Sequence, residues 1–339
     1  MINRLHSMWG LLVTLLLVTA CEKAEKPLVL PPAGAIDTLS ASMGVNYDNQ
    51  VYVDFQTGTT KSVPYRSYDL AFEASADGFR IYLNTAKFMF VGNTGNTDMQ
   101  GADSSGLTWR TETEHLYEDS TAFGEYRNIA GSSKLETYVI DRGRTEHFGA
   151  DRWRKLQVLE VTPTNYKIRY ANYDNSNVTD FIVTKDPDYS LMYFSFNGSG
   201  SMVDVAPEKT DWDLVFTKYT YTYYSEPVTS PYRHYLVSGA LLNKWAGCMN
   251  EQMRKDSSSN YVPFDAFTSN EIASVDFNDL AGKVGFSWKD YDFTLGYIII
   301  PDRYYLVKDS DGFVYKIRFY DFYDSSGNKG TAEFEFKRL

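Results

Sequence analysis

Hydrophobic and polar residues alternate with a period of two along much of the chain. Around Trp212, the alternation directs Trp212, Leu214 and Phe216 to one face and leaves Asp213 and Thr217 on the other. Successive side chains of a β-strand point to opposite faces of its sheet, so this pattern predicts a half-buried strand. The same period continues through Tyr219, Tyr221 and Tyr223.

The last part of the chain has the pattern of a β-meander. The turn residues 309–312 separate two apolar runs, 304–307 and 313–319. This turn ends in an Asp-Gly pair, which tolerates the positive φ of a tight hairpin. A second turn at 325–330 leads into a third run at 331–336. We expect three antiparallel strands here.

Helical patterns are rare. Leu242, Trp245, Met249 and Met253 are spaced as on one face of a helix, although a glycine interrupts them. Residues 265–272 form a second candidate for a short helix. The sequence therefore predicts an all-β fold, mainly antiparallel, with few short helices.

Two short motifs recur within the chain, which indicates an internal duplication. Residues 68–72 (YDLAF) are repeated as 212–216 (WDLVF), and residues 166–170 (YKIRY) are repeated as 315–319 (YKIRF). The two repeats have nearly the same spacing, which chance does not readily explain. The chain is therefore predicted to contain two tandem β modules, residues 38–187 and residues 188–339.

Residues 1–20 have the features of a bacterial lipoprotein signal peptide. Arg4 precedes a short apolar run, 9–18, and small residues stand directly before Cys21. The run is too short to span a bilayer, and a Cys in this position is similar to a lipobox. We expect cleavage before Cys21, lipidation of its sulfur and firm anchoring through two or more acyl chains. Residues 21–37 are typical of a short spacer.

Composition narrows the classes of function. Of the 339 residues, 43% are hydrophobic and 23% are charged, so the bulk of the chain can bury a core and is not disordered. Four His and two Cys disfavour a zinc cluster or a disulfide scaffold. The formal net charge of −11 argues against nucleic acid as a partner, because binding to phosphates requires Lys and Arg.

No catalytic motif is present in the sequence. The chain lacks a nucleophile elbow, a Walker A motif, an HExxH motif and paired CxxC motifs. Glu112 and Glu114 would share one face of a strand, where a solvated surface is the commoner reason for two carboxylates. Two carboxylates suffice for glycoside hydrolysis, but no motif supports an enzyme acting on glycans. We expect a protein that is not an enzyme and has no dedicated metal site.

Three residues are candidates for binding a haem-type ligand. His234 lies in an aromatic setting, where a neutral imidazole can bind porphyrin iron. Met249 and Met253 offer thioether sulfur, although methionines at helical spacing usually belong to a core. A packed or exposed structural role is an open alternative for each of the three.

Four segments of the second module resemble the HmuY-like lipoproteins of Bacteroidota: 210–217, 237–243, 285–289 and 315–319. The resemblance covers the second module and, more weakly, the first. It implies a nearly all-β, hand-shaped domain. The best-known members are haem-binding lipoproteins that pass haem to a TonB-dependent outer-membrane receptor and clamp its iron between two side chains, His or Met. Where one member has a ligating His, this chain has Trp288, whose indole cannot ligate iron.

These observations lead to two expectations about function. The first is an outer-membrane lipoprotein, at the cell surface or on the periplasmic face, that binds or relays haem or another small hydrophobic ligand beside a TonB-dependent transporter. Aromatic residues make up 16% of the chain and can supply the walls of such a site. The alternative is an accessory subunit of an outer-membrane protein complex that binds no haem and whose two modules present a protein-binding surface.

Overall fold

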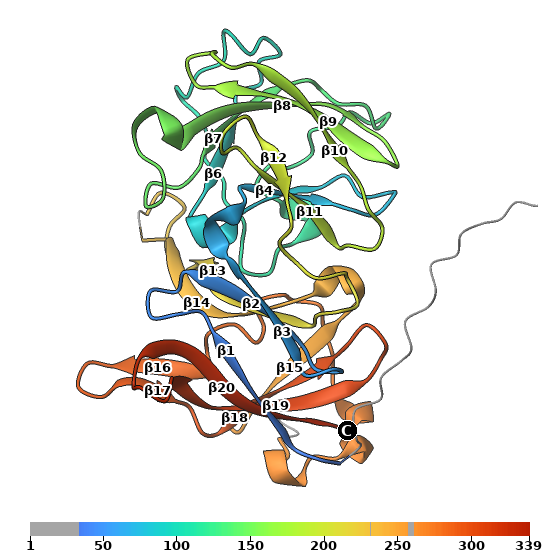
Figure 1. The fold of residues 1–339 in the computed structure, drawn as a ribbon, viewed down its shortest axis with the longest axis vertical. Helices are drawn as coiled ribbons and strands as arrows, with labels where there is room; N and C mark the ends of the chain where they lie inside the picture. Colours follow the sequence, from blue (N-terminus) through green and yellow to red (C-terminus); the bar gives the residue numbers. More distant parts are fainter. Residues whose placement is uncertain (1–33, 231, 257–260) are drawn as a thin grey trace, which may run out of the picture.

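The computed structural model describes residues 34–230, 232–256 and 261–339. In these residues the chain forms antiparallel β-strands joined by loops and short 3-10 helices, and Figure 1 shows the strands stacked in four layers. The predicted all-β, mainly antiparallel fold is confirmed. The predicted signal peptide (1–20), the lipidation residue Cys21 and most of the spacer lie outside the described residues.

Two five-stranded sheets form the outer layers and two four-stranded sheets form the inner layers. The outer layer at the top of Figure 1 has the order β10-β9-β8-β7-β6, with β6 (Phe90–Asn93), β7 (Thr137–Asp141), β8 (Trp153–Val161), β9 (Asn165–Asn172) and β10 (Thr179–Thr184). The inner sheet beneath it has the order β12-β11-β4-β5, with β4 (Leu70–Glu73), β5 (Ile81–Leu83), β11 (Leu191–Ser195) and β12 (Ser201–Val203).

The lower half repeats this arrangement. Its inner sheet has the order β14-β13-β2-β3, with β2 (Asn49–Asp54), β3 (Thr59–Pro64), β13 (Leu214–Thr222) and β14 (His234–Leu242). Its outer sheet has the order β1-β20-β19-β18-β15, with β1 (Asp37–Ser42), β15 (Met249–Arg254), β18 (Arg303–Lys308), β19 (Val314–Tyr323) and β20 (Lys329–Arg338). A separate hairpin, β16 (Lys289–Asp292) and β17 (Gly296–Ile299), projects to the side (Figure 1).

The helices of the described residues are all of the 3-10 type. They are η1 (Tyr65–Ser67), η2 (Thr85–Lys87), η3 (Glu118–Ser120), η4 (Gly149–Arg152), η5 (Lys244–Ala246), η6 (Phe264–Ala266) and η7 (Ser269–Ser274). In the part of the chain that is described, no helix has the length and apolar character needed to cross a membrane.

Each outer sheet packs on one inner sheet and encloses a hydrophobic core. The upper sandwich is built from consecutive strands, β4 to β12. The lower sandwich combines β13–β15 and β18–β20 with the first three strands, because β2 pairs with β13 and β1 pairs with β20. The sheets therefore do not divide between residues 187 and 188, the boundary expected from the sequence. Strand pairing over such distances leaves no local signal in the sequence.

The central strands of the two inner sheets, β2 with β13 and β4 with β11, are buried on both faces. Leu214 and Phe216 point into the core of the lower sandwich, whereas Val215 points into a cluster between the two sandwiches. Asp213 and Thr217 are each only 3% exposed. The prediction of a half-buried strand is therefore wrong here. The alternation separates two buried environments instead of separating a core from solvent.

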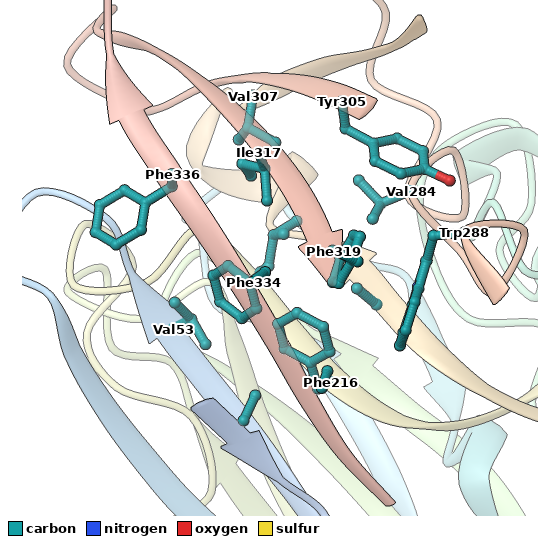
Figure 2. Close-up of a cluster of buried hydrophobic side chains, with 14 of the residues drawn as sticks. Val53, Phe216, Val284, Trp288, Tyr305, Val307, Ile317, Phe319, Phe334 and Phe336 are labelled. Carbon is teal, nitrogen blue, oxygen red and sulfur yellow. The ribbon is translucent and has the colours of Figure 1, made fainter. Parts of the chain in front are cut away.

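The core of the lower sandwich is rich in aromatic side chains (Figure 2). The rings of Phe216 and Phe334 are stacked with centroids 5.4 Å apart, and Trp288 stacks on Phe319 at 4.1 Å. Val53 from β2 belongs to the same cluster. Because Val53 lies on β2 and Phe334 on β20, this core joins the earliest and the last strands of the described residues.

The repeated motifs differ in their structural meaning. The first pair lies in equivalent places: the side chains of Asp69 and Asp213 each accept a hydrogen bond from a backbone N–H of the neighbouring strand. The second pair of motifs does not lie in equivalent places. Residues 166–170 lie on β9, which is second from a sheet edge, whereas residues 315–319 lie on the central strand β19. The equivalent of β19 is β8, which is also central and also carries a β-bulge in its pairing.

The C-terminal meander is confirmed, because β18, β19 and β20 pair in sequence order. The helix expected from Leu242 to Met253 does not form. Gly247 adopts a left-handed φ of 81° after η5, which ends the helical turn, and β15 then pairs with β18. The expected helix at 265–272 is present as the 3-10 helices η6 and η7.

Candidate ligand-binding groove

A groove of about 480 Å³ lies beside the edge strand β14 and the hairpin β16–β17. This volume falls within the range of sites for small molecules. Strand pairing brings the lining together from segments far apart in the sequence. The lining residues are Tyr47, Lys218, Tyr223, Tyr235, Leu236, Val237, Ser238, Phe286, Lys289, Asp290, Tyr291, Tyr297 and Lys329.

Aromatic rings form much of the groove wall. Tyr297 makes edge-to-face contacts with Tyr291, at 5.1 Å between ring centroids, and with Phe322 behind it, at 4.9 Å. Tyr235 and Tyr291 remain open to solvent, with exposed fractions of 62% and 53%. These rings can cover the apolar faces of a flat ligand.

Lys289 lines the groove but is only 6% exposed. Its ammonium nitrogen lies 4.4 Å from the ring centroid of Trp288 and 4.7 Å from that of Phe322, and it donates a hydrogen bond to the backbone carbonyl of Ser238. Burial lowers the pKa of Lys289 to about 7. A bound anion nearby would favour the charged ammonium, because an opposite charge stabilises the protonated form.

The charges lining the groove are mostly positive, although the protein is acidic. Lys218, Lys289 and Lys329 are accompanied by one acidic residue, Asp290. The Lys218 nitrogen lies 3.8 Å from the ring centroid of Tyr65, and burial lowers the pKa of Lys218. An excess of cationic side chains in a protein of net charge −11 favours an anionic ligand.

His234, a predicted ligand residue, is the first residue of β14 and does not line the groove. Its Nδ1 lies 3.2 Å from the Thr222 hydroxyl oxygen, and its ring contacts Phe90 edge to face at 5.9 Å. Burial lowers the pKa of His234, so the imidazole is neutral at pH 7. These contacts are those of a packed structural histidine.

Met249 and Met253, the other predicted ligand residues, lie on one face of β15. Met253 is buried in a separate cluster with Phe264, Tyr304 and Leu306. Neither methionine lines the groove. The structure thus places His234 and the two methionines in different environments and does not combine them into one site.

Two further positions singled out in the sequence are buried. Trp288 is 1% exposed and donates its indole N–H to the carbonyl of Gly285, so it belongs to the core. Glu112 and Glu114 are also buried, at 1% and 2% exposure, which corrects the expectation of a solvated surface. Both accept backbone N–H groups, and burial raises the pKa of Glu112 to about 7.

Other cavities offer less to a ligand. A cavity of about 50 Å³ between the two sandwiches has room for a few waters at most. A polar pocket of about 450 Å³ is lined by acidic and basic residues that pair with one another, such as Arg80 with Glu73 and Glu118. Across the described ranges, no group of three His, Cys, Asp or Glu side chains could hold a metal ion.

Sequence reasoning missed the groove because its residues come from distant segments. A partial signal existed, since 285–289 was singled out as a motif and contains the groove residues Phe286 and Lys289. Within this motif, Lys289 lines the groove, whereas the neighbouring Trp288 belongs to the core.

The HmuY protein family model matches residues 46–336. The chain belongs to the HmuY family. The match runs through both sandwiches, so the family unit includes the upper and the lower half together. No curated protein sequence matches the chain.

Several solved structures are similar over nearly their whole length. Apo PinO from Porphyromonas gingivitis is 10% identical, with 90% of this chain and 97% of that one covered and a TM-score of 0.29. A protein of Bacteroides vulgatus, described as an HmuY-like heme-binding protein, is 11% identical, with coverages of 89% and 91% and a TM-score of 0.22. A protein of Bacteroides fragilis, described as a lipoprotein, is 10% identical, with coverages of 91% and 94% and a TM-score of 0.24. These TM-scores are too low to carry an argument, and membership rests on the family match.

Proposed function

We propose that this protein is a non-enzymatic binding protein whose groove holds a flat, apolar and anionic ligand, with haem as the leading candidate. The observation that carries the proposal is the basic, tyrosine-rich lining of a groove of about 480 Å³ in an acidic protein. Membership of the HmuY family supports a haem-type ligand.

Different groove residues would contact the apolar faces and the carboxylates of the ligand. Tyr235, Tyr291 and Tyr297 offer rings to the face of a porphyrin, since aromatic walls bury its apolar surface. Lys218 and Lys329 offer ammonium groups to the two carboxylates of haem.

The side chains that can reach iron in this groove are phenols. No His or Met is among the lining residues, whereas five tyrosines are. A tyrosine oxygen is an established axial ligand of haem iron. The tyrosines with the largest exposed fractions, Tyr235 and Tyr291, are the candidates for that role.

Titration of the mature protein with haemin tests this function. We expect a Soret shift that saturates at one equivalent, in the position and intensity typical of phenolate ligation. Y235F and Y291F should alter the spectrum if either oxygen binds iron, and K218M with K329M should weaken binding. Y320F is the matched control, because Tyr320 is 52% exposed and does not line the groove. The absence of a Soret shift in both redox states would rule out haem.

We also propose that Cys21 anchors the protein in the outer membrane, beside a TonB-dependent transporter that receives the ligand. The lipobox-like sequence supports the anchor. Metabolic labelling with a fatty acid should mark the wild type and not C21A. Protease treatment of intact cells should degrade the protein if it faces outward, and purification from detergent extracts should recover a barrel partner.

A further inference from the structure

The outer edge of β14 is unpaired over half of its length. At its end, Ala240 exchanges two backbone hydrogen bonds with Gly285, and the N–H of Leu242 donates to Ala281. Backbone groups on one edge of a strand recur every second residue. The N–H and C=O groups of Ser238 and Leu236 therefore point to the same edge.

These groups face the groove. Past Gly285 the neighbouring segment diverges from β14, and the carbonyl of Ser238 is reached only by the ammonium group of Lys289. Within the described residues, the N–H of Ser238 and both backbone groups of Leu236 have no hydrogen-bond partner. All four residues from Tyr235 to Ser238 line the groove, as expected when a strand forms its wall edge-on.

The hairpin that flanks the groove projects from the body and carries exposed apolar side chains at its tip. At the tip of the β16–β17 hairpin, Phe293 is 97% exposed and Leu295 is 73% exposed. The edge itself carries neither Pro nor a charged side chain between residues 234 and 238. Natural sheets usually protect a free edge strand with proline or charged side chains. An edge strand without this protection can pair with another strand.

We infer that the free edge of β14 accepts an extended, acidic segment of a partner protein as an added β-strand. Backbone hydrogen bonds to Leu236 and Ser238 would supply affinity, and alternate side chains would enter the tyrosine-lined groove. The positive lining argues for acidic residues on the partner, because Lys218, Lys289 and Lys329 face a single acidic side chain. This inference goes beyond the proposed function. A strand in this position would occupy the groove and exclude a small ligand from it.

Binding of synthetic peptides tests the inference. The probe is a nonapeptide in which Glu and Val alternate, with a Lys and Val peptide of the same length as its control. We expect the acidic peptide to bind, the basic one not to bind, and amide exchange at Leu236 and Ser238 to slow in the complex. Haemin, if it binds the groove, should compete. Absence of binding by the acidic peptide, or equal binding of both peptides, would overturn the inference.

Matched variants separate the backbone from the side chain. L236P removes the outward N–H and L236A keeps it, while both remove the leucine side chain; S238P and S238A form a second pair in case L236P does not fold. Proline is tolerated on an edge strand. Each proline variant should bind the peptide about tenfold more weakly than its alanine partner.

Equal binding by both members of a pair would contradict strand addition. Haemin titration of each proline variant against its alanine partner keeps the two proposals apart, because both members of a pair have lost the same groove-lining side chain and differ only in the backbone N–H and the proline ring. Self-association would point to a second copy of this chain on the β14 edge and would also overturn the inference. Size-exclusion chromatography detects it.

Discussion

Arg142 and Asp309 occupy equivalent places in the two sandwiches and carry opposite charges. Arg142 directly follows β7, which pairs with β6, and Asp309 directly follows β18, which pairs with β15. Asn84 and Asn243 precede β6 and β15 at the same interval, and each donates hydrogen bonds to two backbone carbonyls. The duplication has therefore kept the framework and reversed a buried charge.

This reversal shifts the pKa values of the two repeated aspartates in opposite directions. Asp69 is buried with Lys87 and Arg142, and although burial raises the pKa of Asp69, these two cations outweigh it and hold that pKa below the usual range. Asp213 has Asp309 nearby and no cation partner in the described residues. Burial raises the pKa of Asp213 well above the usual range, which favours the protonated, neutral carboxyl.

D69N should destabilise the protein strongly, whereas D213N should not. Replacing Asp69 leaves two buried cations without their counter-charge, and breaking such a cluster costs about 3–5 kcal/mol of unfolding free energy. Replacing Asp213, whose neutral form is favoured by burial, with an uncharged amide should cost under about 1 kcal/mol. Urea denaturation at pH 7 measures both. Equal losses would contradict the assigned ionisation states.

K289M should stabilise the fold at neutral pH and weaken binding of an anionic ligand. The pKa of Lys289 is about 7 in the folded protein and near its ordinary value of 10.5 when unfolded. The unfolded state therefore binds more protons between these values, and wild-type stability rises with pH across that interval. The gain in K289M, roughly 1–3 kcal/mol at pH 7, should shrink towards pH 10.5. K308M, on β18 in a different sheet, is the control.

E112Q should remove a loss of stability that the wild type shows as pH rises. Burial raises the pKa of Glu112 from 4.5 to about 7, so the unfolded state releases its proton first and wild-type stability falls between these values. Above pH 7 the variant should be more stable by roughly 1–2 kcal/mol, because an amide oxygen can still accept the N–H of Leu83. Thermal unfolding from pH 4 to 8 measures this. E160Q, at an exposed position, is the control.

F334A should be among the most damaging core substitutions. Phe334 is fully buried and contacts the rings of Phe216 and Phe319 (Figure 2). It also contacts the ring of Phe55. Truncating such a phenylalanine leaves a cavity and costs about 3–5 kcal/mol. F293A, at the exposed hairpin tip, should change stability by less than about 0.5 kcal/mol. A similar effect of both variants would show that the core is not packed as described.

Local patterns predicted the strands well and their partners poorly. The turn at 309–312 and the alternation in β20 involve adjacent residues, so the meander was accessible from the sequence. The pairing of β2 with β13 depends on backbone hydrogen bonds that any residue can make. The contribution of the first strands to the lower sandwich was therefore not predictable from the sequence. The same reason hid the groove, whose lining combines Tyr47 with Lys289.

The candidate ligand residues were chosen by chemical type alone. His234 and Met253 have suitable donor atoms, but the fold uses both for packing. The tyrosines were noted in the sequence as strand formers, yet five of them line the groove. Because tyrosine is common throughout the chain, its occurrence at a given position does not mark a site in the sequence.

The pairing of β1 with β20 has a consequence for biogenesis. The upper sandwich uses one continuous stretch of chain and can be completed as soon as β12 has been synthesised. The lower sandwich forms later, because β1 to β3 are synthesised first and their partners, β13 and β20, are synthesised much later. A chain exported from its amino terminus must therefore keep its earliest strands unaggregated until its last residues emerge. A truncation near the carboxyl terminus should thus expose the beginning of the protein to proteolysis.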